Sequence, residues 1–330
     1  MILFYLLATV LSCVAGFFDS FGVLETASAA LLVCACLKNG NTKFKRSALI
    51  YVSSVLISVA SAAVIYCFVY GLNELLLPEN LLTLSQILHP YIVALPIIIC
   101  LSNKKDPITT ATFAISASSV YIIAINCLSV FVSYDHFGFD AFQFFISDMS
   151  QEYLKVFLEL YKDQNVGILA QEIYVSFMTR ASVSLLPGIC IMLAVIQVFS
   201  VIAILKFILK ERLTDFHKGP WAVSLSLPSA IINVICIIAF MSCFFSSSID
   251  TFTAVAGNIM LIFTPASAIL GFAFLMIGVH KGGFINLIFS ALPILMIFLA
   301  PQIAIIYISF MGSANVIFSR IAMAILKIKK

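Results

Sequence analysis

Charged residues are scarce in this chain. Its 330 residues include 18 lysines and arginines and 15 aspartates and glutamates, so that only 10% of the sequence is charged. A soluble domain carries about a quarter charged residues to cover its surface. With 62% hydrophobic residues and a mean hydropathy of +1.14, the composition excludes a soluble globular protein and indicates one embedded in lipid. The formal net charge of +3 is too small to indicate a nucleic-acid partner.

The sequence also lacks the common motifs of enzymes and metal sites. No stretch matches the GxxxxGK[ST] nucleotide-binding loop or the HExxH zinc motif, and the four histidines are far apart along the chain. The nine cysteines form no CxxC pair and lie in or beside apolar runs, where they are expected to pack as small apolar residues. We therefore expect no enzyme activity, catalytic residue, metal site or cofactor.

One long polar segment, from Asp135 to Arg180, interrupts the apolar runs, and its carboxylates outnumber its basic residues. Basic residues are retained on the cytoplasmic side of a membrane, so this segment is expected outside the cell. The basic loop at residues 38–46 is expected inside. These assignments predict a multi-pass protein of the cell (plasma) membrane with a cytoplasmic N-terminus. No basic region precedes the first apolar run, so we expect that run to be a retained span rather than a cleaved signal.

Apolar runs of about the length that a membrane-crossing helix needs, roughly 20 residues, recur along the chain. They cover residues 2–18, 21–37, 48–70, 84–101, 109–132, 182–205, 226–245 and 252–279. The last apolar stretch, residues 282–319, is too long for one span. Either a ninth span ends near Phe310 and an interfacial helix follows, or the chain turns at Pro301 and a tenth span returns.

The predicted fold class is therefore all-α: a polytopic transmembrane helical bundle of nine or ten spans with an extracytoplasmic amphipathic segment. We divide the chain into N-terminal transmembrane helices (1–133), extracytoplasmic amphipathic helices (134–181) and C-terminal transmembrane helices (182–330). In the middle part, apolar residues between Asp148 and Asp163 follow helical spacing, and a second amphipathic stretch follows a break at Gly167. These helices either lie in the outer interface or cover a cavity between the spans.

Polar groups inside spans are costly and are candidates for function. Glu25 lies in the second run, and His89 precedes Pro90 at the outer start of the fourth, where a broken helix would resemble those that build transporter substrate sites. Each has a structural alternative: a carboxylate reached by water, and an ordinary kink beside an interfacial histidine. Because the deduced orientation puts the candidates in the outer half of the membrane, we predict one group of ligand-binding residues: Glu25, His89, Asn126, Arg180 and Asn258.

The remaining three candidates have alternatives as well. Asn126 and Asn258 are single amides that could form hydrogen bonds between helices. Arg180, at the outer mouth of the sixth span, could meet an anionic group or anchor the helix by snorkelling.

Small residues recur every four positions on the first span, at Ala8, Ser12 and Gly16. Such spacing lets helices approach closely. The stripe is expected either to pack inside the bundle or to bind a partner membrane protein.

Several short stretches in the second part of the chain carry a family resemblance. They are Gln151–Lys155, Leu185–Gly188, Lys206–Arg212, Phe216, Trp221, Pro228, Asn258, Gly271, Gly312, Phe318 and Arg320. In their order and spacing the chain resembles the YybS-like family of uncharacterised bacterial membrane proteins, although Asn315 stands where that family commonly has aspartate. That family is remotely similar to the substrate-binding S components of energy-coupling factor transporters.

This resemblance implies a subunit that binds or transports a small molecule whose identity the sequence leaves open, surrounded by the lipid bilayer. The alternative is a membrane scaffold or assembly partner with no ligand site, and a weaker third option is a membrane enzyme acting on lipid. A cavity lined by Glu25, His89 and Asn126 would favour the first, and a solid bundle the second.

Overall fold

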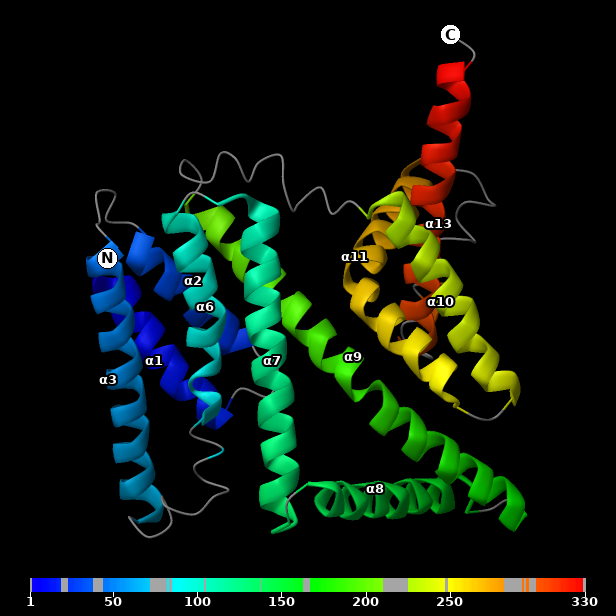
Figure 1. Cartoon of the computed structure of the whole chain (residues 1–330), viewed down its shortest axis with the longest axis horizontal. Coiled ribbons are helices and arrows are strands. Elements are labelled where there is room, and N and C mark those ends of the chain that lie inside the picture. The colour runs from blue at the N-terminus through cyan, green and yellow to red at the C-terminus, as the bar shows by residue number, and fades with distance from the viewer. Residues whose placement is uncertain are drawn as a thin grey trace. The chain divides into compact units, whose positions relative to one another are not determined.

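The computed structural model is helical throughout the part of the chain that it describes. That part comprises residues 2–18, 23–37, 44–71, 82, 85–103, 105–136, 138–162, 167–209, 225–246, 249–281, 293, 295–296 and 301–328. Within these ranges every regular element is a helix, which confirms the predicted all-α class (Figure 1).

Five of the described helices are long and apolar enough to cross a membrane: Ser47–Val69, Pro107–Ser133, Ile168–Ile208, Thr251–Ile277 and Ile303–Met323. Shorter apolar helices cover Leu3–Ser12, Val23–Leu37, His89–Ser102 and Leu227–Cys243. The polytopic bundle is therefore confirmed. The choice between nine and ten spans depends on residues 282–300, most of which lie outside the described part, and stays a prediction.

The chain forms two compact units. The first comprises Met1–Phe145 and Leu193–Trp221. Its helices are α1 (Ile2–Phe18), α2 (Val23–Leu37), α3 (Phe44–Tyr70), α6 (His89–Ser102), α7 (Pro107–Ser133) and the last part of α9 (Ile168–Ile208). Helix α2 has a largely buried surface because it is built from alanine, serine and cysteine between a few larger residues. Its buried residues pack with α6 and the last part of α9 in one apolar core.

The small-residue stripe of α1 faces α2 within this unit. Ala8 and Ser12 are fully buried, the hydroxyls of Ser12 and Ser28 are hydrogen-bonded, and Ser28 Oγ donates to the carbonyl oxygen of Ala8 at 2.8 Å. Internal packing therefore accounts for these two residues. Ala8 and Ser12 present no free surface, while the alternative that a partner membrane protein binds the stripe stays a prediction. The side chain of Gly16 lies outside the described part.

The fourth predicted span is shorter than expected. We predicted residues 84–101, whereas α6 begins at His89, after a turn at residues 87–88, and has Pro90 in its first turn. Proline is well tolerated there because the first amides of a helix have no intrahelical acceptor. Pro90, for which an ordinary kink was one of the two alternatives, therefore lies at a helix start, and Pro96 is the proline inside this helix.

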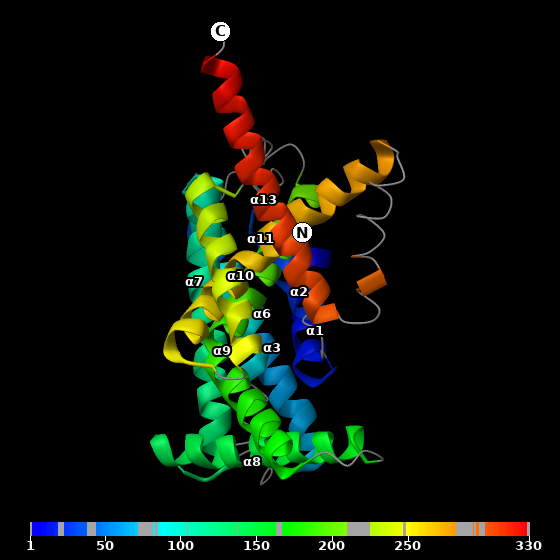
Figure 2. The same ribbon diagram turned by 90° about the vertical axis from the view of Figure 1, so that its right-hand side faces the viewer.

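The second unit comprises Ile146–Met192 and Ala222–Lys330. It contains most of α8 (Phe139–Leu160), the first part of α9, α10 (Leu227–Ser246), α11 (Thr251–Lys281) and α13 (Pro301–Ile328). Figure 2 shows α10, α11 and α13 crossing one another, and all three pairs are in contact. Where α11 meets α13, a Cβ added to Gly271 would lie 1.9 Å from the carbonyl oxygen of Ile308, so the two backbones touch.

Helix α9 differs from the prediction. It begins at Ile168, which confirms the break at Gly167, but it continues for 41 residues to Ile208. The expected second outer helix and the sixth span are thus one helix. From Ile168 up to Pro187 the helix contains no proline or glycine, and the change from polar to apolar composition alone does not end it. The three-part division of the chain relative to the membrane stays a prediction.

Candidate functional site

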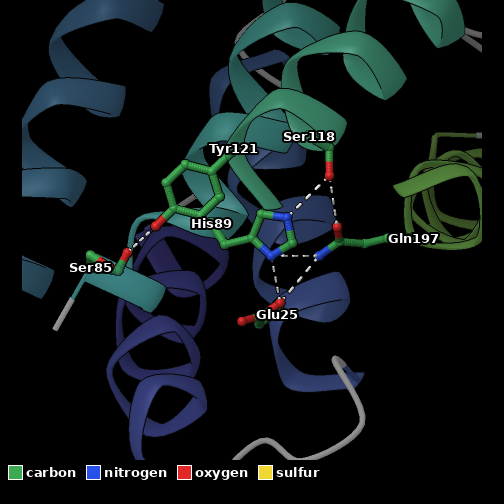
Figure 3. Close-up of polar contacts among 6 residues, drawn as sticks. All are labelled: Glu25, Ser85, His89, Ser118, Tyr121 and Gln197. Carbon is green, nitrogen blue, oxygen red and sulfur yellow. Dashed lines mark hydrogen bonds and ion pairs between the residues drawn. The ribbon is translucent and has the colours of Figure 1, made fainter. Parts of the chain in front are cut away.

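A carboxylate and an imidazole meet inside the first unit. Glu25 lies in the first turn of α2, and His89 is the first residue of α6. The Nδ1 atom of His89 lies 2.8 Å from Oε2 of Glu25, and the side chains of His89 and Glu25 are 11% and 16% exposed (Figure 3). Two ionisable groups so far from water are expected to be retained only when they satisfy one another.

Ser118 and Gln197 complete a network around this pair. Nε2 of His89 lies 3.1 Å from Oγ of Ser118 on α7, and that hydroxyl donates to Oε1 of Gln197 on α9 at 3.2 Å. The amide Nε2 of Gln197 donates to Oε2 of Glu25 at 3.3 Å. The four side chains come from four helices, and Figure 3 shows them converging on the imidazole ring.

The hydrogen-bond directions define the protons of this network. Because the Ser118 hydroxyl donates to an amide oxygen, which can only accept, it is left to accept a proton from Nε2 of His89. The short contact between Nδ1 and the carboxylate then requires a second proton, held by either His89 or Glu25.

Tyr121 fixes the orientation of the imidazole. Its ring stacks on that of His89 with centroids 5.2 Å apart and an interplanar angle of 17°. The hydroxyl of Tyr121 donates to the carbonyl oxygen of Ser85, which anchors the tyrosine ring (Figure 3). Stacking and anchoring together restrict rotation of the histidine, so its two nitrogens keep distinct partners.

A cavity of about 760 Å³ adjoins the network. Its polar lining is Glu25, Thr26, His89, Gln197 and Ser200, and its apolar lining is Val23, Ala27, Ile122, Leu193, Ile196 and Ile204. Small-molecule sites usually measure about 300–1,000 Å³ and combine an apolar wall with a few polar groups. A smaller cavity of about 200 Å³ also contains Glu25 and His89, together with Tyr121 and Asn126.

The structure brings together three of the five predicted site residues. Glu25 and His89 are in direct contact, and Asn126 lines the smaller cavity, although its amide is bonded to its own helix at Ile122 O. Arg180 and Asn258 belong to the second unit.

Asn258 connects two helices of that second unit. Its Oδ1 accepts from the amide of Gly188 at 2.6 Å, and its Nδ2 donates to the carbonyl oxygen of Ser184 at 2.7 Å. These bonds join α11 to α9, which is the interhelical role given as its alternative.

Sequence reasoning missed Gln197, Ser118 and Tyr121. Gln197 is a single amide in an apolar run, the same signal that selected the asparagines. Ser118 resembled the small residues that pack helices, and nothing in the sequence marked Tyr121. Among the described residues, no group of three or more His, Cys, Asp or Glu side chains is arranged to hold a metal ion.

Comparison with known families adds one finding. The profile of a family described as predicted membrane protein (DUF2232) matches residues 75–316. The chain belongs to this family. No curated protein and no solved structure matches it.

As a DUF2232 protein with several candidate spans, the chain is a multi-pass integral membrane protein. The matched range includes His89, Ser118 and Gln197, whereas Glu25 lies before it. The family description names no activity, ligand or partner.

Proposed function

We propose that this protein binds a small molecule in the cavity beside Glu25, His89 and Gln197, as a subunit of a transport system in the cell membrane. In this proposal the N-terminus is cytoplasmic, and other proteins supply the energy. The resemblance to the YybS-like family, and through it to the S components of energy-coupling factor transporters, supports this role by analogy.

The observation that carries it is the position of the Glu25–His89 pair on a cavity wall. A pair that served packing alone would need no adjoining space, whereas this pair lines a cavity of about 760 Å³ and a second of about 200 Å³. Ionisable groups in membrane-spanning segments generally line ligand or ion pathways. A solid bundle would instead have favoured the scaffold alternative.

The lining suggests what the ligand looks like. Leu193, Ile196 and Ile204 provide an apolar wall from α9. Glu25 and Gln197 provide polar contacts in the same lining, with an acceptor and a donor within a single network. The cavity therefore suits a small organic molecule with an apolar body and one polar group that donates a hydrogen bond or carries positive charge.

A thermal-shift screen of the full chain in detergent tests the proposal. The ligand set contains vitamins, small amines and small anions, so that cationic, neutral and anionic compounds are all represented. We expect at least one compound to raise the unfolding temperature, and Glu25→Gln and Gln197→Ala to reduce its affinity about tenfold, as expected for a lost hydrogen bond to a charged group.

The matched control is Glu152→Gln, which removes the same charge from an exposed position on α8. It should leave ligand affinity unchanged. No shift with any compound, together with a membrane protein that co-purifies stoichiometrically, would instead favour the scaffold or assembly role.

A further inference from the structure

A second cavity, in the other compact unit, has a different chemistry. It measures about 460 Å³ and lies between α8 and the first part of α9. Ile146, Ser150 and Leu154 line it from α8, and the α9 side is formed by Gln171, Glu172, Val175, Ser176, Thr179 and Arg180. Contacts between Phe157 and Tyr174, whose ring centroids are 5.2 Å apart, hold the two helices together.

One buried polar group in this cavity wall has no hydrogen-bond partner in the part of the chain that the structure describes. Thr179 is 6% exposed, and its hydroxyl forms no hydrogen bond among the described residues. A threonine in a helix can usually donate to the carbonyl one turn earlier, and burying a hydroxyl without any partner is unfavourable. An unsatisfied hydroxyl in the wall of a cavity therefore points to a ligand atom that accepts from it.

Arg180 stands beside this hydroxyl in the sequence and lines the same cavity. Its side chain is exposed, and among the described residues it forms no ion pair. An arginine guanidinium presents several donors in a fork that matches the oxygens of a phosphate group. The hydroxyl and the guanidinium together thus provide donors for one anionic group.

The depth of Arg180 in the membrane narrows the choice of anion. It is the last charged residue of α9 before Lys206, and the residues between them form the apolar span. A charged residue at the end of such a span lies at the level of the lipid head groups, where phosphate is the abundant anion. The apolar residues Ile146, Leu154 and Val175 in the same lining would accommodate the rest of an amphiphile.

Glu172 adds a further constraint. Its carboxylate lines the cavity about two turns before Arg180, roughly 12 Å along the helix axis. A bare dianion would be repelled by this carboxylate, whereas a phosphate ester that also carries an ammonium group would meet an acid at one end and a base at the other.

From these observations we infer that the α8–α9 cavity binds a phosphate ester with an amine, of the phosphoethanolamine type, through Arg180 and Thr179. The source is either a membrane lipid head group or a soluble phosphate ester. This site is independent of the proposed ligand site at Glu25, because its lining lies wholly in the other unit.

Binding to the delipidated full chain in a maltoside detergent tests the inference. The probes are dihexanoyl phosphatidylethanolamine, phosphorylethanolamine, inorganic phosphate and dihexanoylglycerol. Both ethanolamine esters are expected to bind more tightly than inorganic phosphate, and the glycerol lipid is expected not to bind. A lipid that binds much more tightly than phosphorylethanolamine identifies the membrane as the source, and equal affinities identify a soluble ester.

Single substitutions test which lining residues of the α8–α9 cavity contribute to binding. Arg180→Gln should lower the binding affinity for both esters by about tenfold or more. Thr179→Val keeps the shape of the side chain but removes the hydroxyl, and it should lower the affinity by a smaller factor. Glu172→Gln should lower the binding affinity for the ethanolamine esters relative to that for inorganic phosphate. The matched control is Lys155→Gln, which removes a positive charge from the exposed face of α8. It should leave the binding affinity for every probe unchanged.

The inference would be overturned if dihexanoylglycerol bound as well as the phospholipid, if no probe bound, or if Arg180→Gln and Thr179→Val bound like the parent chain. Should Arg180→Gln fail to fold, Thr179→Val alone decides the result. Glu25→Gln should not affect this binding, so failure here and failure of the proposed function are separate outcomes.

Discussion

The imidazole of His89 is held between the carboxylate of Glu25 at 2.8 Å and the hydroxyl of Ser118 at 3.1 Å. Each nitrogen of the ring thus has its own partner, on α2 and α7 respectively. An imidazole that bonds a carboxylate through one nitrogen and a hydroxyl through the other links the helices that carry those two groups. The imidazole of His89 therefore joins α6 to both α2 and α7 through polar contacts.

Glu25→Ala should destabilise the protein. The substitution removes the acceptor for Gln197 Nε2 and for the His89 nitrogen, so two buried polar groups lose a partner. We expect a loss of about 1–3 kcal/mol in the free energy of unfolding. Circular dichroism at rising temperature in detergent would measure it. The control, Glu152→Ala, alters an exposed pair and should change stability by less than about 0.5 kcal/mol. Equal stability of both variants would contradict the buried network.

Gly271→Ala and Gly312→Ala should each separate α11 from α13. An added Cβ would lie 1.9 Å from a backbone oxygen, that of Ile308 or of Ser267, and a backbone cannot move aside as a side chain can. Overpacking of this kind costs about 1–3 kcal/mol, more than the roughly 1 kcal/mol that alanine gains in helix propensity. Gly167→Ala is the control, since nothing lies within 4 Å of its added Cβ. Thermal unfolding of the three variants should rank Gly167→Ala as the most stable.

Two aspartates at helix starts should make stability depend on acid pH. The side-chain hydrogen bond from Thr109, followed by that from its backbone amide, lowers the pKa of Asp106. The backbone amide of Thr253, followed by its hydroxyl, lowers the pKa of Asp250. A carboxyl whose folded pKa is depressed contributes stability above its unfolded pKa, and this contribution is lost as the pH falls through the folded value.

The unfolding temperature should therefore fall as the pH drops below about 4, close to the unfolded pKa of aspartate. The variant Asp106→Asn with Asp250→Asn keeps capping residues that do not titrate, so its unfolding temperature should fall less over the same range. A pH series of melting curves for the two proteins makes the comparison. Parallel curves would mean that these caps do not contribute to acid sensitivity.

The orientation of the chain can be tested by cysteine labelling. Because the segment around α8 is acidic and residues 38–46 are basic, a membrane-impermeant maleimide applied to intact cells should label Glu152→Cys. It should label Lys43→Cys only after the cells are permeabilised. The parent chain provides the background from native cysteines. Labelling of both positions from the same side would reverse or abolish the deduced orientation.

The helices were predictable because lipid imposes a simple rule, that backbone groups must be satisfied within a helix over the whole thickness of the membrane. The first and seventh runs show this, since residues 2–18 coincide with α1 and residues 226–245 nearly coincide with α10. What the rule does not determine is continuity. Helix α9 changes from amphipathic to apolar without a break, because side-chain polarity does not interrupt the backbone bonds.

The site was only partly predictable. Glu25 and His89 stood out because charge is expensive in an apolar run, and the structure pairs them across 64 positions of sequence. Gln197 lies 108 positions from His89, and a neutral amide has too small a cost to be singled out among other polar residues. Their meeting depends on how α2, α6, α7 and α9 dock, which hydropathy does not encode.

The crossing of α11 and α13 also predicts how relatives of this chain vary. Since main chain meets main chain at Gly271 and Gly312, natural substitutions there should be rare, and a larger residue at one position should coincide with compensating changes in the opposite helix. Gly167 has open space around it, so the residue at this position should vary among relatives. An alignment of DUF2232 sequences would thus record the distance between two helices as a pattern of invariance.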